Sequence, residues 1–183
     1  MSLPEEKFCT EDDYYNLSED VRAELINGQI YYHAAPSRIH QEVLMELAGT
    51  IRNYIRDKNG PCKVYPAPFA VKLSAEEGTT IVEPDISVIC NPDKLTDRGC
   101  TGAPDWIIEI VSPGNSSHDY VLKLNKYMTA GVREYWIVNP QAYTVLVYHF
   151  EEANLTPKAY TFNDRIKVNI YDDLYLDFKI FNL

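Results

Sequence analysis

The sequence predicts an α/β domain in which a mixed β-sheet is flanked by helices, and three observations support this prediction. Asn27-Gly28 separates two short apolar runs, which is the strongest short-range signal of a β-hairpin. Residues 37–57 repeat their apolar side chains at helical spacing. Residues 105–138 have the pattern strand, helix, strand, which implies a parallel strand pair with a right-handed crossover. Because no repeat or flexible linker divides the chain, we expect a single domain over 1–183.

The first third of the chain is expected to hold a polar lead-in, the hairpin and a long helix. Residues 1–20 are polar and acidic, and the hairpin follows over 23–36. Ser37 is a suitable helix N-cap, and Asn59-Gly60 is a suitable helix end. The apolar face of this helix comprises Ile39, Val43, Leu47, Ile51 and Ile55.

Strands are expected to dominate the remainder. Pro66 and Pro68 interrupt or bend the strand that follows the first helix. The next run, 81–89, is rich in β-branched residues and is predicted to be one buried strand. The other expected elements are a strand at 105–111, a helix from about 116 to 130, strands at 134–140 and 143–150, and additional strand in the C-terminal stretch 162–180.

The chain is acidic, with 27 acidic and 17 basic residues and a formal net charge of −10. This balance counts against a protein that coats nucleic acid non-specifically, because affinity for phosphates depends on clustered Lys and Arg. It leaves open a local basic groove, or a bound cation that inverts the local field.

The expected location is the cytoplasm, without a membrane partner. The N-terminus is acidic and lacks the apolar stretch of a signal peptide, and no apolar run approaches the ~20 residues needed to cross a bilayer. The four cysteines lack metal-ligand spacing, so we expect free thiols in a reducing cytosol and no structural zinc site. They are Cys9, Cys62, Cys90 and Cys100.

Glu109 stands where an apolar residue is expected. Side chains at i and i+2 share one face of a strand, so Glu109 lies between Ile107 and Val111 on one face of the run 105–111. The opposite face is also apolar, and the run therefore has no solvent face. An ionised carboxylate there must be protonated, paired with a cation or bound to a metal.

Asp85 repeats this anomaly within the predicted strand 81–89, where its face also carries Glu83 and Ser87. Two buried acids on strands that are neighbours in sequence suggest a shared cation. Mg²⁺ prefers carboxylate oxygens and retained waters, which such a pair supplies. The alternative is that each acid sits at a strand end and caps a loop or pairs with an Arg.

Lys123 is the basic residue best placed to act beside these acids. In the predicted helix 116–130, Lys123 lies at the edge of the apolar stripe and Lys126 nearly opposite it. Lys123 can therefore reach the sheet, where a cation would stabilise a developing oxyanion. The alternative is a surface pair with Asp119, worth a few tenths of a kcal/mol.

Two further residues are supporting candidates. His40 falls on the apolar face of the first helix, where a lone His is most often a core residue with a satisfied ring. Its place in the first helical turn leaves open a role beside the metal. Glu24, next to Leu25 and Ile26 in the first hairpin strand, is a weaker version of the Glu109 anomaly.

These residues lie in stretches that resemble the Uma-two family of endonucleases, within the PD-(D/E)XK restriction-endonuclease-like superfamily. The resemblance covers most of residues 23–149 in the family's order. It implies a restriction-endonuclease-like mixed β-sheet core flanked by helices, with acids on adjacent central strands behind the N-terminal β-hairpin. The matching stretches are AELINGQIYYHAAPSRIHQEV, VYPAPFAVKLS, VEPDISVIC, DRGCTGAPDWIIEIVSP and KLNKYMTAGVREYWIVNP.

Carried over by position, the resemblance makes Asp85 the motif's Asp and Glu109 its second acid, both binding Mg²⁺ or Mn²⁺ with the Ile110 carbonyl as a further ligand. The motif's Lys belongs two residues after Glu109, where this chain has Val111. In this family the Lys has moved to the next helix, and Lys123 in KLNKY occupies the matching position. The recurrent family positions also include Glu24 and His40.

The leading hypothesis is a Mg²⁺-dependent endonuclease that hydrolyses phosphodiester bonds of nucleic acid, DNA being the expected substrate. Its catalytic residues are Asp85, Glu109 and Lys123. The net charge of −10 keeps two alternatives open: a catalytically inactive nuclease-fold protein that acts as a binding or regulatory module, and a phosphohydrolase of a small acidic substrate. We also expect a homodimer, because the 14 tyrosines offer contact area and a dimer suits double-strand cutting.

Overall fold

The computed structural model describes residues 8–18, 20–73, 79–112, 117–152 and 155–181, and the side chains of 117–119 and 180 are not described. The helices are α1 (Glu11–Tyr15), α2 (Arg38–Asp57) and α3 (Ser117–Ala130), with short 3₁₀ helices η1 (Pro92–Lys94) and η2 (Phe178–Phe181). The strands are β1 (Ala23–Ile26), β2 (Gln29–Tyr32), β3 (Lys63–Pro66), β4 (Val71–Leu73), β5 (Thr80–Val82), β6 (Ile86–Ile89), β7 (Leu95–Thr96), β8 (Gly99–Thr101), β9 (Trp106–Ile110), β10 (Glu134–Asn139), β11 (Thr144–His149), β12 (Lys158–Thr161), β13 (Arg165–Lys167) and β14 (Tyr175–Asp177).

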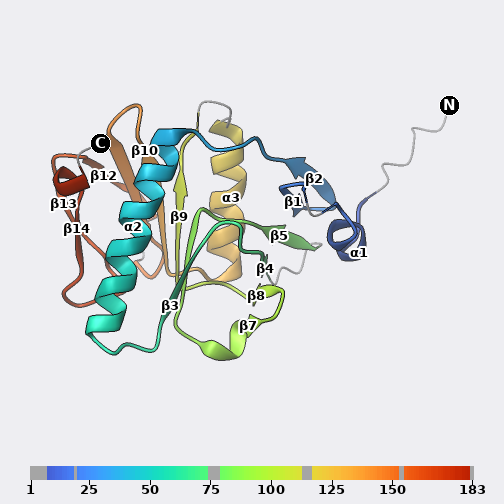
Figure 1. Ribbon diagram of the computed structural model, residues 1–183, viewed down its shortest axis with the longest axis horizontal. Coiled ribbons are helices and arrows are strands. Elements are labelled where there is room, and N and C mark those ends of the chain that lie inside the picture. Colours follow the sequence, from blue (N-terminus) through green and yellow to red (C-terminus); the bar gives the residue numbers. More distant parts are fainter. Residues whose placement is uncertain (1–7, 19, 74–78, 113–116, 153–154, 182–183) are drawn as a thin grey trace.

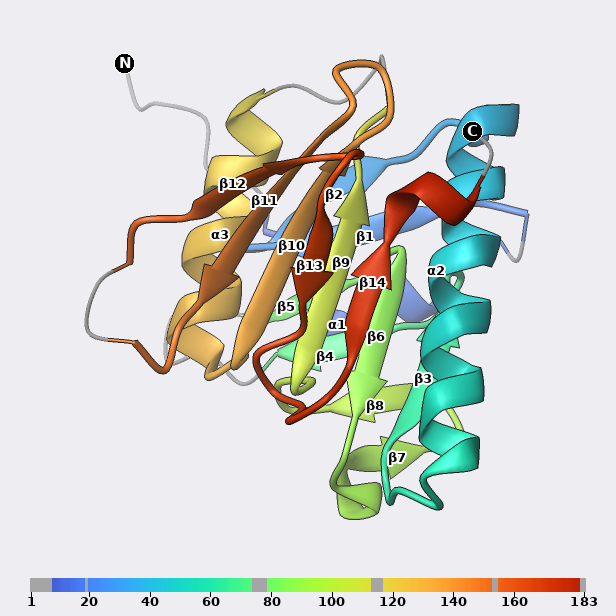
Figure 2. The same cartoon turned by 90° about the vertical axis from the view of Figure 1, so that its left-hand side faces the viewer.

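The central sheet has six strands in the order β12-β11-β10-β9-β6-β3. The expected strand–helix–strand unit is confirmed, because β9 and β10 pair in parallel and α3 connects them. The other pairs in this sheet are antiparallel. Figures 1 and 2 show α2 and α3 on opposite sides of the sheet, with β13 and β14 beside α2.

Strand alternation sorts the side chains of β9 between the two sides. Trp106, Ile108 and Ile110 join the core formed with α2 and the C-terminal segment, in contact with Trp136 and Val138 of β10. The intervening Ile107 packs in a second core that includes Tyr127 of α3. Glu109 shares the parity of Ile107, so its side chain is directed to the α3 side, as the period-two pattern predicts.

A second six-stranded sheet, in the order β2-β1-β5-β4-β8-β7, holds the N-terminal hairpin. Asn27 and Gly28 both have positive φ, of 52° and 77°, as a type I′ hairpin turn requires. The second sheet contains one parallel pair, β4 with β8, and is otherwise antiparallel. The described residues therefore form two six-stranded sheets where one mixed sheet was predicted, and β13 and β14 pair as a separate two-stranded sheet.

The expectation of one buried strand over 81–89 is wrong. The run divides into β5 and β6, which belong to different sheets, and Glu83, Pro84 and Asp85 form the crossing between them. Pro84 lacks the N–H needed to continue a ladder, which is why the pairing stops there. Asp85 consequently lies one residue before β6 and not within a strand.

The expectation of four free thiols is also wrong. Cys62 and Cys90 form a disulfide, while Cys9 and Cys100 are free. The antiparallel pairing of β3 with β6 brings the two bonded cysteines together, and the spacing along the chain does not reveal this pairing. Among the described residues, none of the helices combines the length and apolarity that a membrane crossing needs.

Candidate active site

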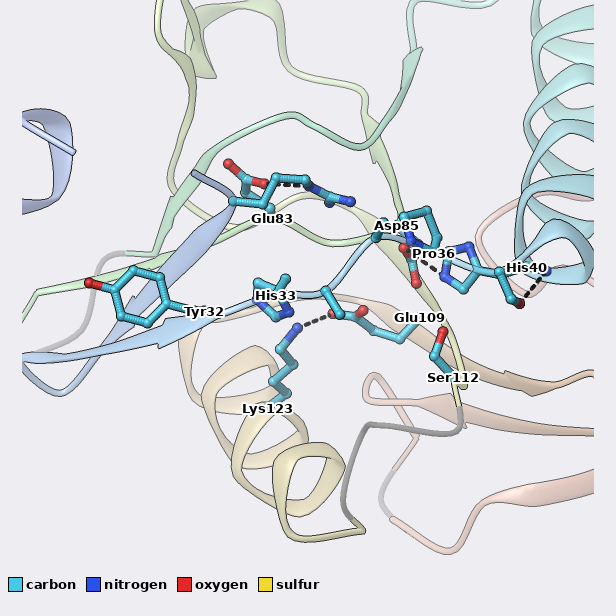
Figure 3. A pocket seen from close by; sticks show the side chains of 13 residues that line it. Tyr32, His33, Pro36, His40, Glu83, Asp85, Glu109, Ser112 and Lys123 are labelled. Carbon is cyan, nitrogen blue, oxygen red and sulfur yellow. Dashed lines mark hydrogen bonds and ion pairs between the residues drawn. The ribbon is translucent and has the colours of Figure 1, made fainter. Parts of the chain in front are cut away.

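A polar cavity of about 320 Å³ lies where the two sheets, α2 and α3 meet. Its lining comes from distant parts of the chain: the end of the hairpin, the start of α2, the crossing between β5 and β6, the end of β9, and α3. Figure 3 shows this arrangement from close by. The sequence-predicted residues Asp85, Glu109, Lys123 and His40 all line the cavity.

Glu109 is 5% exposed and has two donors on α3. The Tyr127 hydroxyl donates to its Oε1 at 2.6 Å, and the Lys123 ammonium donates to the same oxygen at 3.0 Å. Lys123 and Tyr127 are four residues apart and therefore lie on one face of the helix, where both reach β9. Tyr127 was not singled out from the sequence, because helical spacing does not show which group a tyrosine hydroxyl reaches.

Asp85 is connected to the strand that carries Glu109. Its Oδ2 accepts a hydrogen bond from the backbone N–H of Ile110 at 2.7 Å, and Oδ1 lies 3.1 Å from Nε2 of His40. The first contact fixes Asp85 beside the residue that follows Glu109, so the two carboxylates face one cavity. Within the described ranges, no Arg lies at ion-pair distance from Asp85 or Glu109, which excludes the guanidinium alternative there.

Lys123 is buried and bridges two carboxylates. Its ammonium donates to Glu24 Oε1 at 2.8 Å as well as to Glu109. Burial opposes the charged form, but the negative charges of Glu109 and Glu24 outweigh it and raise the pKa of Lys123 above its usual range. Lys123 thus turns towards the sheet, as predicted. The alternative partner, Asp119, has a side chain outside the described residues.

Glu24 is 1% exposed in β1 and has more partners than any sequence pattern indicated. Besides Lys123, its Oε1 accepts from the backbone N–H of Glu83 at 2.8 Å, and its Oε2 lies 3.2 Å from His33 Nε2. Burial alone would raise its pKa, but Lys123 and His33 lower the pKa of Glu24 to about 2. Glu24 is therefore ionised and holds Lys123 from the side opposite Glu109.

The pKa of Glu109 is shifted in the opposite direction. Burial, and then the charges of Asp85 and Glu24, raise the pKa of Glu109 to about 7, although Lys123 and Tyr127 act against this. One ammonium cannot compensate three neighbouring carboxylates, and Glu24 holds its charge through additional donors. Glu109 consequently takes up a proton more readily than Glu24 does, and a raised pKa is a typical property of a functional carboxyl.

His40 lies at the start of α2, where its backbone N–H is capped by the Ser37 hydroxyl at 3.3 Å. It is 5% exposed, and its Nδ1 has no hydrogen-bond partner among the described residues. The alternative, a core histidine with a satisfied ring, is therefore wrong for His40. Its Nε2 lies beside Asp85, and its Nδ1 is unpaired among the described residues. His33, at the end of the hairpin, was missed; its position directly after a β-strand gave only a weak signal.

No three His, Cys, Asp or Glu side chains in the described part of the chain come close enough together to hold a metal ion by themselves. The site offers instead two carboxylates from neighbouring elements, Asp85 and Glu109, with a buried lysine behind them. Its acids outnumber its permanent cations, since Glu24, Glu83, Asp85 and Glu109 stand against Arg22 and Lys123. Such a cluster favours an additional cation.

Comparison with known proteins identifies the family of the chain. The Uma2 family model, described as "Putative restriction endonuclease", matches residues 11–178. A protein of Synechocystis sp. (strain ATCC 27184 / PCC 6803 / Kazusa) named "Uncharacterized protein slr1290" is 23% identical over 127 residues, which is 69% of this chain and 65% of that protein. The chain therefore spans slightly less than two thirds of this relative.

The structure also resembles a solved one. The crystal structure of a "putative nuclease belonging to DUF820" from Anabaena variabilis ATCC 29413 superposes with a TM-score of 0.77 at 21% identity, covering 94% of this chain and 96% of that one. This likeness confirms the predicted restriction-endonuclease-like α/β fold. Together with the match over residues 11–178, it leads to one assignment: the chain belongs to the Uma2 family of restriction-endonuclease-like proteins.

Proposed function

We propose that this protein is a metal-dependent endonuclease that hydrolyses phosphodiester bonds of nucleic acid, with DNA as the expected substrate. The observation that carries the proposal is the pairing of Asp85 and Glu109 at one cavity: the Asp85 carboxylate is bonded to the N–H of Ile110, and its charge contributes to the raised pKa of Glu109. Two carboxylates that repel one another across a polar cavity favour a divalent cation. Membership of the Uma2 family supports the same reaction class.

The donor set fits Mg²⁺ or Mn²⁺. Mg²⁺ keeps several waters and is commonly held by one or two carboxylates together with substrate phosphates, so a site without a third acidic or imidazole ligand is sufficient. Within the described ranges, both hydrogen bonds to Glu109 fall on Oε1, which leaves Oε2 for another ligand. We assign Asp85 and Glu109 as the residues that hold the ion. When bound, it supplies Lewis-acid polarisation of the phosphodiester.

The remaining roles follow from the contacts. Lys123 is held in its charged form, and its ammonium is placed to orient the attacking water or to stabilise the negative charge that develops on the phosphate. Glu24 positions Lys123 and keeps its ammonium charged when Glu109 binds the metal ion. His40, 3.1 Å from Asp85 Oδ1, orients that carboxylate.

The test is a cleavage screen on single-stranded and double-stranded DNA and RNA with Mg²⁺ and Mn²⁺. Wild-type protein should cleave at least one substrate, and Asp85→Ala should abolish cleavage while leaving the circular dichroism spectrum unchanged. Asp93→Ala, which removes an exposed acid on η1, is the matched control and should cleave as wild type does. Equal Mg²⁺-dependent cleavage by Asp85→Ala would rule out the role assigned to Asp85.

One observation favours a second candidate. The net charge of −10 is unusual for a protein that binds extended nucleic acid, and it favours a catalytically inactive nuclease-fold module that binds a partner, or a phosphohydrolase of a small acidic substrate. An inactive module should cleave nothing in the screen and lose no metal site in Glu109→Ala. The proposal further includes a cytoplasmic location and a homodimer, and sedimentation of the purified protein tests the homodimer.

A further inference from the structure

The end of the N-terminal hairpin forms a wall of the cavity that the proposed chemistry does not use. Tyr32 is the last residue of β2, and Arg22 directly precedes β1. The backbone N–H of His33 donates to the Arg22 carbonyl at 2.9 Å, so the two strand ends are held side by side. The Arg22 and Tyr32 side chains both line the cavity that contains Asp85 and Glu109.

Tyr32 is a large aromatic residue left open to solvent at this wall. It is 68% exposed, and within the described ranges its ring stacks on no other aromatic side chain and has no cation over it. Figure 3 shows its hydroxyl directed away from Glu109 and Asp85. The exposed tyrosines elsewhere do have such partners: Tyr143 contacts the ring of Phe162, and Tyr175 lies under the Arg165 guanidinium. Neither of them lines this cavity. The ring of Tyr32 is therefore available to a ligand.

Arg22 supplies the matching positive group. Its one ion pair among the described residues joins Nε to Glu83 Oε2 at 3.6 Å, which is too long for a direct hydrogen bond. The Nε atom is buried without a hydrogen-bond partner in the described part of the chain, and the side chain is 34% exposed. A guanidinium with unused donors is well suited to bidentate contact with a phosphate.

From these contacts we infer that the site takes single-stranded nucleic acid, or an unpaired end, with one base stacked on Tyr32 and the adjoining phosphate held by Arg22. This inference rests on the proposed function and names its substrate class. A base can stack on an aromatic side chain only when it has left the duplex, and such stacking tolerates any sequence.

The charges of the cavity support the same substrate class. Binding of duplex DNA depends on many Lys and Arg contacts to phosphates. The permanent cations in this lining are Arg22 and Lys123, and Lys123 is already bound by Glu24 and Glu109. A single stranded segment that contributes a base to Tyr32 and a phosphate to Arg22 needs no long basic groove, which agrees with the net charge of −10.

The test compares the affinity of variants for a labelled single strand and for a blunt duplex of the same sequence by fluorescence anisotropy. Titrations are made with Ca²⁺, a hard cation that also takes oxygen ligands, and again in EDTA. Tyr32→Ala should weaken binding of the single strand about tenfold, in keeping with the ~1–3 kcal/mol that one stacked base contributes. Duplex binding should change little, and Tyr32→Phe should bind as wild type does because it keeps the ring.

Two further variants separate stacking from general damage. Tyr143→Ala, which removes a similarly exposed tyrosine away from the cavity, should leave single-strand binding unchanged. Arg22→Gln should weaken binding and reduce the slope of log affinity against log salt by roughly 0.7, the value for one phosphate contact on a single strand. Thermal unfolding of each variant should confirm that the fold is intact.

The inference is overturned if Tyr32→Ala binds the single strand as tightly as wild type does, if it loses single strand and duplex equally, or if wild type binds neither. The proposed function fails separately. If wild type binds the single strand through Tyr32 but cleaves nothing with Mg²⁺ or Mn²⁺, the substrate class stands and the nuclease activity does not. If cleavage depends on Asp85 but not on Tyr32, the nuclease activity stands and the single-stranded substrate class does not.

Discussion

Two groups of buried acidic side chains in this molecule have different surroundings, although the central acid of each, Glu134 in the first and Glu109 in the second, stands in a strand of the same sheet. Glu134 begins β10 and is fully buried. Its two oxygens accept hydrogen bonds from Trp136 Nε1 at 2.7 Å, from the backbone N–H of Asn169 at 2.7 Å and of Ile170 at 3.0 Å, and from Asn169 Nδ2 at 3.0 Å. All of these donors are neutral, and together they attach the C-terminal segment to the central sheet.

Glu109, on the adjacent strand β9, belongs to the second group. It shares one ammonium with Glu24, lies near the charge of Asp85 and borders an open cavity. Burial raises the pKa of both Glu134 and Glu109, but the additional cause at Glu109 is the neighbouring negative charge. Burial of an acid therefore does not by itself indicate a functional site. Uncompensated like charges beside a cavity are the better indicator of one.

Removal of Lys123 should have the largest effect on stability, because it leaves Glu24 and Glu109 buried without their cation. We expect Lys123→Met to lower the free energy of unfolding by about 3–5 kcal/mol at neutral pH, measured by urea denaturation. The loss should shrink at acidic pH, where protonated carboxyls no longer need the ammonium. Lys126→Met on the same helix is the matched control and should change stability by less than about 0.5 kcal/mol.

Glu134→Gln should affect stability alone, which separates the two groups. In either orientation of the Gln amide, its nitrogen faces two donors that it cannot accept, so we expect a loss of about 2 kcal/mol in the free energy of unfolding. Metal affinity and any cleavage should be those of wild type. A clear change in metal affinity in this variant would mean that the two groups are coupled, contrary to the comparison above.

A smaller effect is expected for the hydroxyl that binds Glu109. Tyr127→Phe should cost about 1 kcal/mol of stability and raise the pKa of Glu109 further, because a donor to the ionised form is lost. Tyr135→Phe is a close control: its ring centroid lies 5.0 Å from that of Tyr127, and its buried hydroxyl has no hydrogen-bond partner among the described residues. Equal stabilities for the two variants would contradict the role of Tyr127.

Sequence patterns were sufficient to predict some of the site residues. Alternation along β9 predicted the face that Glu109 shares with Ile107, and the apolar stripe of α3 predicted that Lys123 reaches the sheet, because both signals depend only on local periodicity. The same reasoning applied to Glu134 would not have separated it from Glu109, since its neutral donors come from residues 169–170, far along the chain. Local patterns report burial but not the partners that compensate it.

Long-range pairing explains the errors. The division of 81–89 between two sheets is marked locally by Pro84, but the sheet that each half joins depends on β1 and β9, which are distant in sequence. The disulfide of Cys62 with Cys90 likewise follows from the pairing of β3 with β6. His33 and Tyr127 were missed as site residues for the same reason, because only their contacts with Glu24 and Glu109 place their polar atoms in the site.

We propose above all that Asp85 and Glu109 together hold one divalent cation. Calorimetric titration of Mn²⁺ into wild type, Glu109→Ala and Glu134→Gln at pH 6 and pH 8 tests it most directly. Because the pKa of Glu109 is raised to about 7, its proton must leave before it binds the ion, and the affinity of wild type should be about tenfold lower at pH 6 than at pH 8. We expect a single Mn²⁺ site that is lost in Glu109→Ala and retained in Glu134→Gln. Absence of Mn²⁺ binding by wild type, or equal binding by Glu109→Ala, would contradict the claim.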